Sequence, residues 1–240
     1  MAQKDLTEKN LEFYPDVFAD LINVLLYKGR PILDPEALQP APTETLYPGY
    51  EGALYRNQVE QKNSFPVISL VLYWGSKKWT PPQSIHQFFS KNNIPTEVYS
   101  YIDNSQLHIY EMARLPDEIR DLFKSDMRIV VDFLAEQSNY VPTEQKIQHL
   151  EALLFLLKAI TGDDRYEEIL PVLIQQEKEK GEVTMCELLD KYENKGKAEG
   201  ENRMALLIQK LLKADREEDL LKASENVEYR NQLFQEFGIA

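Results

Sequence analysis

The sequence has few residues of several kinds, and each shortage excludes a class of structure. Cys186 is the one cysteine among 240 residues, so an internal disulfide is excluded and a reducing compartment suits the chain. No apolar run approaches the roughly 20 residues that cross a bilayer. The first five residues also lack the apolar core of a signal peptide. We therefore predict a cytoplasmic protein that does not span a membrane.

Positive charge is scarce as well. The chain has 27 lysines and arginines against 40 acidic residues, which gives a formal net charge of −13. We expect any binding to DNA to be weak, because it would depend on a local basic patch or a bridging metal ion. The three histidines, His86, His108 and His149, lie far apart, and no Cys-x-x-Cys occurs. A zinc site is therefore not predicted.

Residues 65–75 form the one run that is typical of a buried β-strand. β-branched and aromatic residues fill it, and Pro66 and Gly75 bound it. Its apolar residues do not alternate with polar ones, which predicts a strand covered on both faces. Such a strand needs neighbours for its backbone groups. Residues 107–112 alternate well enough to be a second, weaker strand, and few other candidates exist.

The remaining pattern is helical. Apolar residues recur at three- and four-residue spacing, proline and acidic residues stand at several expected starts, and glycine follows several expected ends. Gly196 and Gly200 should weaken a long charged helix by roughly 1 kcal/mol each relative to alanine. Pro171 should either kink a helix or begin a new one. The expected helices cover residues 14–28, 50–62, 84–89, 117–123, 127–136, 143–161, 165–176, 184–215, 217–224 and 227–237, with 204–212 grouped with the last two in a small tail.

Two literal matches to the Pro-Asp…Glu-x-Lys pattern of Mg²⁺-dependent nucleases occur. Asp16 can be matched with Glu60 and Lys62, and Asp117 with Glu144 and Lys146. Both aspartates stand in expected first turns of helices, where acidic residues are common anyway. We expect Glu60 at a helix end or turn and Glu144 at a helix start, so neither match predicts a strand-borne metal site. The catalytic residues therefore stay unknown.

Tyr55, Arg56 and Gln58 are candidates for DNA contact. An arginine can bind a phosphate, and a tyrosine or glutamine can contact a base edge or sugar. The alternative is that Tyr55 packs against neighbouring side chains and that Arg56 is an ordinary surface charge. Both alternatives stay open.

A set of segments, taken in order, resembles the Rpn family of recombination-promoting nucleases, which are also described as transposases. The segments cover residues 15–27, 49–58, 65–75 with Trp79, 127–134, 161–165, 184–187, 195–201 and 236–239. The family is a branch of the PD-(D/E)XK superfamily and cleaves DNA with Mg²⁺. The resemblance therefore implies a mixed sheet flanked by helices.

The resemblance also implies that a piece is missing. Family members carry two metal-binding strands between segments that resemble residues 43–47 and 49–58, and here Pro48 alone separates these two segments. We therefore expect an α+β, predominantly helical protein. It would be a remnant of the PD-(D/E)XK core with a reduced sheet and a helical C-terminal half. Its expected parts are a truncated nuclease-like core (1–115), a helical region packed on it (116–182), and a charged long helix with a small helical tail (183–240).

Three functional hypotheses follow from this resemblance. The first is an inactive family member that needs no cofactor, whereas intact members use Mg²⁺. The second is an interaction role, in which the chain binds itself or an intact relative through the sheet edge or the helical tail. The third is an active nuclease with relocated carboxylates such as Glu44, Glu51 or Glu60. A fourth possibility is a degenerate chain that does not fold well.

Overall fold

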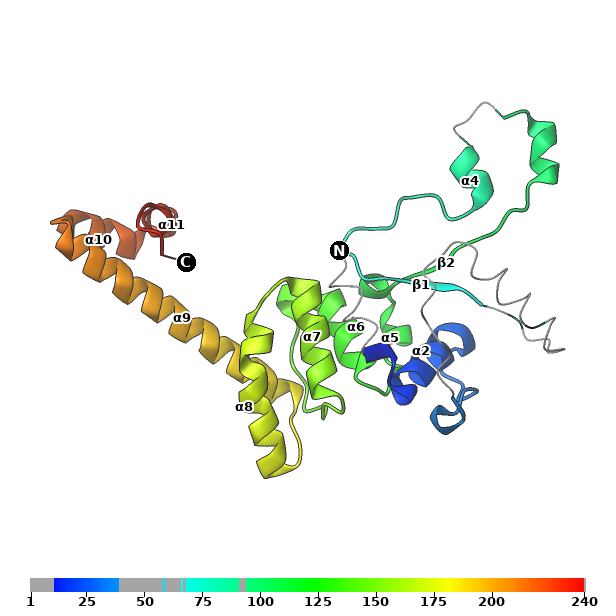
Figure 1. Ribbon diagram of the computed structural model, residues 1–240, viewed down its shortest axis with the longest axis horizontal. Helices are drawn as coiled ribbons and strands as arrows, with labels where there is room; N and C mark the ends of the chain where they lie inside the picture. The colour runs from blue at the N-terminus through cyan, green and yellow to red at the C-terminus, as the bar shows by residue number, and fades with distance from the viewer. Residues whose placement is uncertain (1–10, 39–57, 59–65, 67, 91–93, 240) are drawn as a thin grey trace. The chain divides into compact units, whose positions relative to one another are not determined.

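The chain packs as two compact units, Met1–Val141 and Pro142–Ala240 (Figure 1). The structure is a computed structural model that describes residues 11–38, 58, 66, 68–90 and 94–239. In these ranges the protein is mostly helical with one small sheet, so the expected α+β, mainly helical class is confirmed. The boundary between the units falls inside the region 116–182, which sequence analysis treats as one part. The packing of that whole region on the core stays a prediction.

The first unit begins with helix α2 (Pro15–Tyr27), close to the expected helix 14–28. Pro15 opens the first turn, where no backbone N–H is needed. Lys28 ends the helix in the left-handed conformation with φ 55°. Asn23 then holds the following connector, because its Oδ1 accepts hydrogen bonds from the amides of Ile32 and Leu33 at 2.9 and 2.8 Å.

The sheet has two parallel strands, β1 (Leu70–Tyr73) and β2 (His108–Glu111). Leu70 pairs with His108 and Tyr73 with Glu111, so the weaker strand expected over residues 107–112 is confirmed. The expected full burial of residues 65–75 is wrong for the described part: every β1 residue is half-buried, and Ile68 is 56% exposed. A strand with one described neighbour keeps part of its surface accessible, which periodicity along the sequence could not indicate.

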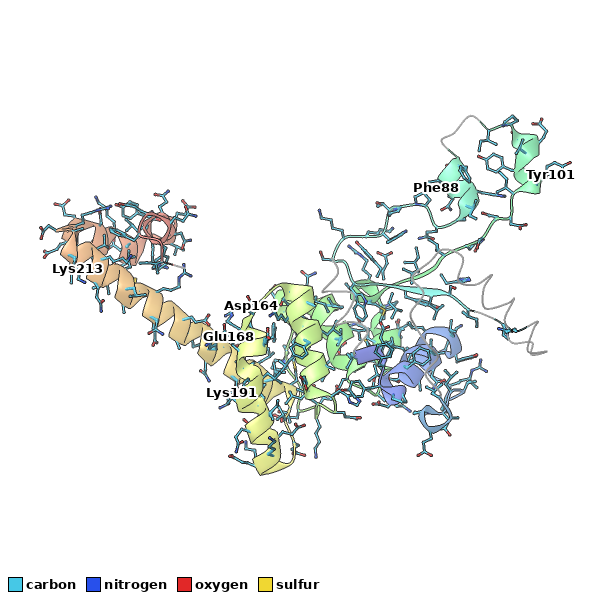
Figure 2. All side chains as sticks on the ribbon, in the orientation of Figure 1. Phe88, Tyr101, Asp164, Glu168, Lys191 and Lys213 are labelled. Carbon is cyan, nitrogen blue, oxygen red and sulfur yellow. The ribbon has the colours of Figure 1, made fainter. Side chains whose placement is uncertain are left out.

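An arm, which we define by the described residues 83–90 and 94–107, is inserted between the two strands (Figure 1). It holds the short helix α4 (Ile85–Phe89), capped by Ser84 as expected, and the 3₁₀ helix η2 (Thr96–Tyr101). The arm closes at its base, where Ser84 pairs with Gln106 and the amide of Leu107 donates to Gln83 O at 2.8 Å. Two aromatic side chains of the arm are exposed, Phe88 on α4 at 66% and Tyr101 at the end of η2 at 89% (Figure 2).

Two helices complete the first unit, α5 (Asp117–Arg120) and α6 (Met127–Glu136). Helix α6 has the bounds that apolar spacing predicts, and it buries Met127, Ile129, Val130, Val131 and Leu134. Asp20 of α2 joins the α5–α6 connection to the N-terminal helix, since its Oδ2 accepts hydrogen bonds from the amides of Lys124 and Ser125, both at 2.8 Å. The 3₁₀ helices η1 (Pro35–Ala37), η3 (Met112–Arg114) and η4 (Gln137–Asn139) fill the connections.

The second unit opens with a correction to the expected helix 143–161. Helix α7 covers Leu150–Thr161 only, and residues 143–149 before it are not helical. The amide of Ile147 donates to Val183 O at 2.9 Å, and the amide of Met185 donates to Gln145 O at 3.2 Å. This short antiparallel contact satisfies the backbone groups that a longer helix would have used, and it buries Ile147.

Two long helices follow, α8 (Arg165–Lys180) and α9 (Met185–Lys213). Helix α8 runs through Pro171 as one element, so the alternative of a new helix at this proline is wrong. Thr184 and Glu187 form a capping box at the start of α9, in which each side chain binds the other residue's backbone amide. That cap explains why a long helix begins there.

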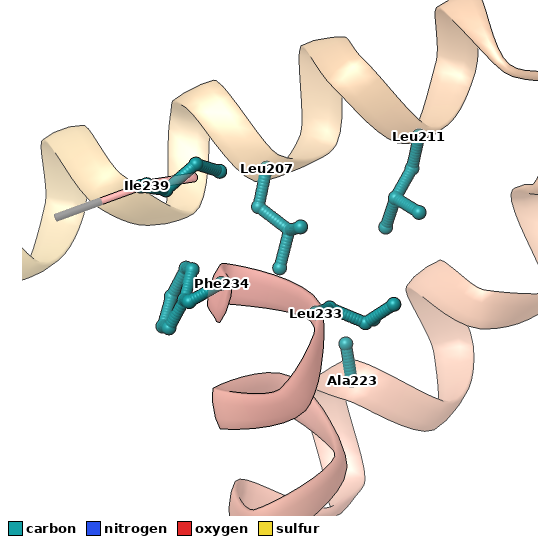
Figure 3. Packing of buried hydrophobic residues seen from close by; sticks show 6 residues of the cluster. All are labelled: Leu207, Leu211, Ala223, Leu233, Phe234 and Ile239. Carbon is teal, nitrogen blue, oxygen red and sulfur yellow. The ribbon is translucent and has the colours of Figure 1, made fainter. Parts of the chain in front are cut away.

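The chain ends in a head, which we define as residues 204–239. It combines the end of α9 with helices α10 (Glu217–Glu225) and α11 (Val227–Glu236). Residues 204–212 belong to α9 and are not the separate tail helix expected from the sequence. One apolar cluster joins the three helices (Figure 3). Its buried members are Leu207, Leu211, Ala223, Leu233, Phe234 and Ile239.

Over the same described ranges, none of the helices combines the length and the apolar character that crossing a membrane requires.

Candidate functional site

Most residues predicted to act on DNA fall outside the part of the chain that the structure describes. This holds for Tyr55 and Arg56, and also for the relocated carboxylates Glu44, Glu51 and Glu60. Gln58 is described; it is helical and half-buried. The expected helix 50–62 is represented by this residue alone. The proposed contacts of the three DNA candidates therefore stay predictions.

The nuclease-like sequence matches do not form a described site. Asp117 opens α5 as expected and lies in the first unit, whereas Glu144 and Lys146 lie in the second unit. The expectation that Glu144 opens a helix is wrong, because α7 begins at Leu150. Lys146 forms an ion pair with Glu182. Asp16 stands in the first turn of α2, as expected, and its partners Glu60 and Lys62 are outside the described residues.

Arg120 lies at the centre of a cluster of charged side chains in the first unit. It is 8% exposed and binds three carboxylates. Its Nη1 lies 2.5 Å from Asp132 Oδ1 and 3.3 Å from Glu136 Oε1, and its Nη2 lies 2.6 Å from Asp117 Oδ1. Burial lowers the pKa of Arg120, but hydrogen bonds and the nearby negative charges outweigh burial and raise it above its usual value. The guanidinium therefore stays charged and neutralises these acids.

Arg128 extends the cluster along α6. Its Nη2 lies 2.7 Å from Asp121 Oδ1, and its Nε donates to Asp132 Oδ2. Asp132, with a side chain 14% exposed, thus bridges two arginines. A carboxylate whose oxygens already accept hydrogen bonds from two guanidinium groups is poorly suited to bind a divalent cation, because the cation needs the same oxygens as ligands. The cluster is consistent with a structural ion-pair network.

The second unit has a smaller polar cluster where α8 begins, formed by Asp163, Arg165 and Tyr192. Arg165 Nε lies 3.0 Å from Asp163 Oδ1, and its Nη2 donates to the Tyr192 hydroxyl at 2.7 Å. That hydroxyl donates to Asp163 Oδ2 at 2.6 Å. The Arg165 guanidinium also lies 4.3 Å from the centre of the Tyr192 ring. These contacts close a triangle that fastens α9 to the start of α8.

The cluster shifts the pKa of each member. The hydrogen bond from Arg165 holds the pKa of Asp163 well below its usual range, and the same bond raises the pKa of Arg165. Both groups therefore stay ionised at any physiological pH. The triangle has no member that could exchange a proton near neutrality, so it is not suited to acid–base catalysis at that pH.

Tyr192 allows a direct test of this geometry. Burial and the hydrogen bond to Asp163 raise the pKa of Tyr192 to about 12. The folded state therefore favours the neutral phenol, and this stabilisation is complete below about pH 10 and lost as the pH rises toward 12. We expect the difference in phenolate absorbance between the native protein and Tyr192→Phe to titrate near pH 12. A difference that titrates near the ordinary pKa of about 10 would contradict the triangle.

Gly196 explains how Arg165 reaches α9. A Cβ atom at Gly196 would lie 2.4 Å from Nη1 of Arg165, closer than two such atoms can approach. The missing side chain therefore makes room for the guanidinium. Gly200 differs, because a Cβ atom there would meet no heavy atom within 4 Å beyond its chain neighbours and the backbone of its own helix. The two glycines, which look alike in the sequence, have different surroundings.

Sequence reasoning missed both clusters. Part of the first cluster has a signal in the sequence, because opposite charges three or four residues apart on a helix form ion pairs. This spacing separates Asp117 from Arg120 and Arg128 from Asp132, so these two pairs were predictable. No local signal indicates the contact between Arg165 and Tyr192, which are 27 positions apart.

A metal centre needs several ligand side chains that converge on one point. Among residues 11–38, 58, 66, 68–90 and 94–239, no group of three or more His, Cys, Asp or Glu side chains could hold a metal ion. His86 instead lies with Nε2 2.8 Å from Ile102 O inside the arm. The expectation that the chain needs no cofactor stays a prediction.

Comparison with known proteins found no matching protein-family model, no matching curated protein and no matching solved structure.

Proposed function

We propose that this chain is an Rpn-like member of the PD-(D/E)XK nuclease group that keeps a reduced scaffold and does not cleave DNA. The observation that carries the proposal is that three of the described acidic side chains in the first unit bind other groups of the protein. Asp132 binds two arginines, Asp20 accepts from two backbone amides, and Glu111 accepts from the amide of Trp79 at 2.9 Å. Carboxylates with such partners stabilise the fold and are not free to bind Mg²⁺.

The order of elements supports the same proposal. Segments that resemble the family coincide with α2, with β1, with α6, with the turn before α8 and with the cap of α9. The β1–β2 pair is parallel and joined through a long connection, as in sheets that are flanked by helices. Mg²⁺ remains the cofactor of intact family members, and Tyr55, Arg56 and Gln58 remain the proposed contacts of any weak DNA binding.

The test is a cleavage assay with the purified chain, supercoiled plasmid and Mg²⁺. We expect the plasmid to remain supercoiled, whereas an intact Rpn-type nuclease in the same buffer cleaves it. Cleavage that persists through purification would contradict the proposal. If Glu51→Ala or Glu60→Ala then abolished the cleavage, the relocated-carboxylate hypothesis would replace it.

A second candidate function is binding to an intact relative. The described sheet has only two strands, and the outer edge of a strand presents N–H and C=O groups that can pair with another chain. Mixing the chain with an intact relative and measuring the mass of the complex in solution tests this function. A stable mixed complex would favour a regulatory role, and two separate species would exclude it.

A further inference from the structure

Helix α9 is attached to other elements near both of its ends. Met185 and Leu188 near its start are fully buried, and the triangle of Asp163, Arg165 and Tyr192 fastens its next turn. Lys195 then pairs with Glu168 of α8 at 2.7 Å, with Glu168 labelled beside α9 in Figure 2. The charge of Glu199, which contributes to the raised pKa of Arg165, is the last of these links with α8.

The second attachment of α9 is to the head. Arg203, just before the head, contacts it first along the chain, and its guanidinium lies 4.4 Å from the centre of the Phe234 ring. Buried apolar packing begins at Leu207 and involves residues of the head (Figure 3). The core of the head is thus assembled around the last turns of α9 and the two helices that follow.

Residues 200–202 lie between these two attachments. Gly200, Glu201 and Asn202 are all exposed, and a Cβ atom at Gly200 would meet no heavy atom within 4 Å beyond its chain neighbours and the backbone of its own helix. The backbone here depends on helical hydrogen bonds that face water. A short helical stretch without tertiary contacts is marginally stable, and glycine weakens it further because it gains more freedom when the helix opens.

We infer that residues 200–202 form a joint in α9, at which the helix opens locally and the head changes direction while it stays folded. The opening breaks the few hydrogen bonds that span the joint and needs no change in the packed clusters on either side. Low local stability of this kind is typical of segments that move. The inference goes beyond the proposed function, since it requires neither DNA cleavage nor its absence.

Hydrogen exchange of the full chain, followed by mass spectrometry, tests whether the joint opens. We expect amides of residues 201–205 to exchange about tenfold or more faster than those of residues 188–192 and 207–211. Gly200→Ala should slow this exchange about three- to fivefold, and Ala198→Gly should speed it by a similar factor. Equal exchange along the whole of α9 would overturn the inference.

Distance measurement between two spin labels tests whether the head moves. Lys178→Cys on α8 and Glu228→Cys on α11 place labels at exposed positions, with Cys186→Ser to remove the native thiol. We expect a broad distance distribution that narrows in the Gly200→Ala variant. A single narrow distribution with Gly200 in place would overturn the inference, even if the local exchange were fast.

Discussion

Leu207→Ala is expected to unfold the head while the first unit remains intact. Leu207 is fully buried in the one apolar cluster of the head, and its truncation should cost about 3 to 5 kcal/mol. A small core has little stability to spare, so a loss of this size should melt its helices first. Denaturant titration followed by far-ultraviolet circular dichroism should show an early loss of helix.

The two tryptophans make this experiment selective. Trp74 and Trp79 both lie in the first unit, so tryptophan fluorescence reports on that unit and not on the head. We expect the fluorescence midpoint to stay unchanged in Leu207→Ala. Leu206→Ala is the matched control, because the Leu206 side chain, next to Leu207 in the sequence, is 47% exposed and its truncation should cost less than about 1 kcal/mol. Equal effects of the two variants would contradict the described packing.

Arg120→Met is expected to destabilise the first unit by about 2 to 4 kcal/mol. Removing one partner of a buried ion pair typically costs about 3 to 5 kcal/mol, because the other charge stays buried without compensation. Here Asp132 keeps Arg128, and Asp117 is 83% exposed and can be solvated, so the expected cost is lower than the typical range. Denaturant titration followed by tryptophan fluorescence measures the change in the free energy of unfolding.

Arg114→Met gives the matched control, because it makes the same substitution at a more exposed arginine of the first unit. Arg114 pairs with Glu111 at 3.5 Å, and its side chain is 47% exposed. Loss of such a pair should change the free energy of unfolding by no more than about 1 kcal/mol. If Arg120→Met cost as little as this control, the buried position of Arg120 would be wrong.

Helices with strong local patterns could be predicted from the sequence. Helix α6 has the predicted bounds because its apolar residues recur at helical spacing and pack in the same unit. The prediction that α7 starts at residue 143 is wrong for a physical reason. Ile147 also fits helical spacing, but its backbone amide binds Val183 O, far along the chain. Periodicity along one segment carries no information about such a distant partner.

The same limit applies to the sheet and to the candidate site. The strand in residues 65–75 was recognised, but its burial depends on how many neighbours cover it, which the run itself does not encode. Arg165 was part of a recognised segment, yet its role depends on Tyr192 and on the space left by Gly196. The carboxylates of the first unit were similarly visible as charges, and their arginine partners became clear only from the fold.

The closed base of the arm affects how the parallel strands can come together. Parallel strands require a long connection, and the entropy lost in closing such a loop grows with its length. The pairing of Ser84 with Gln106 joins the chain partway, so the remaining segments that must be brought together are much shorter. Closure of the base therefore lowers the entropic cost of pairing β1 with β2 during folding. Substitutions within the arm should leave the strand register unchanged as long as the base stays closed.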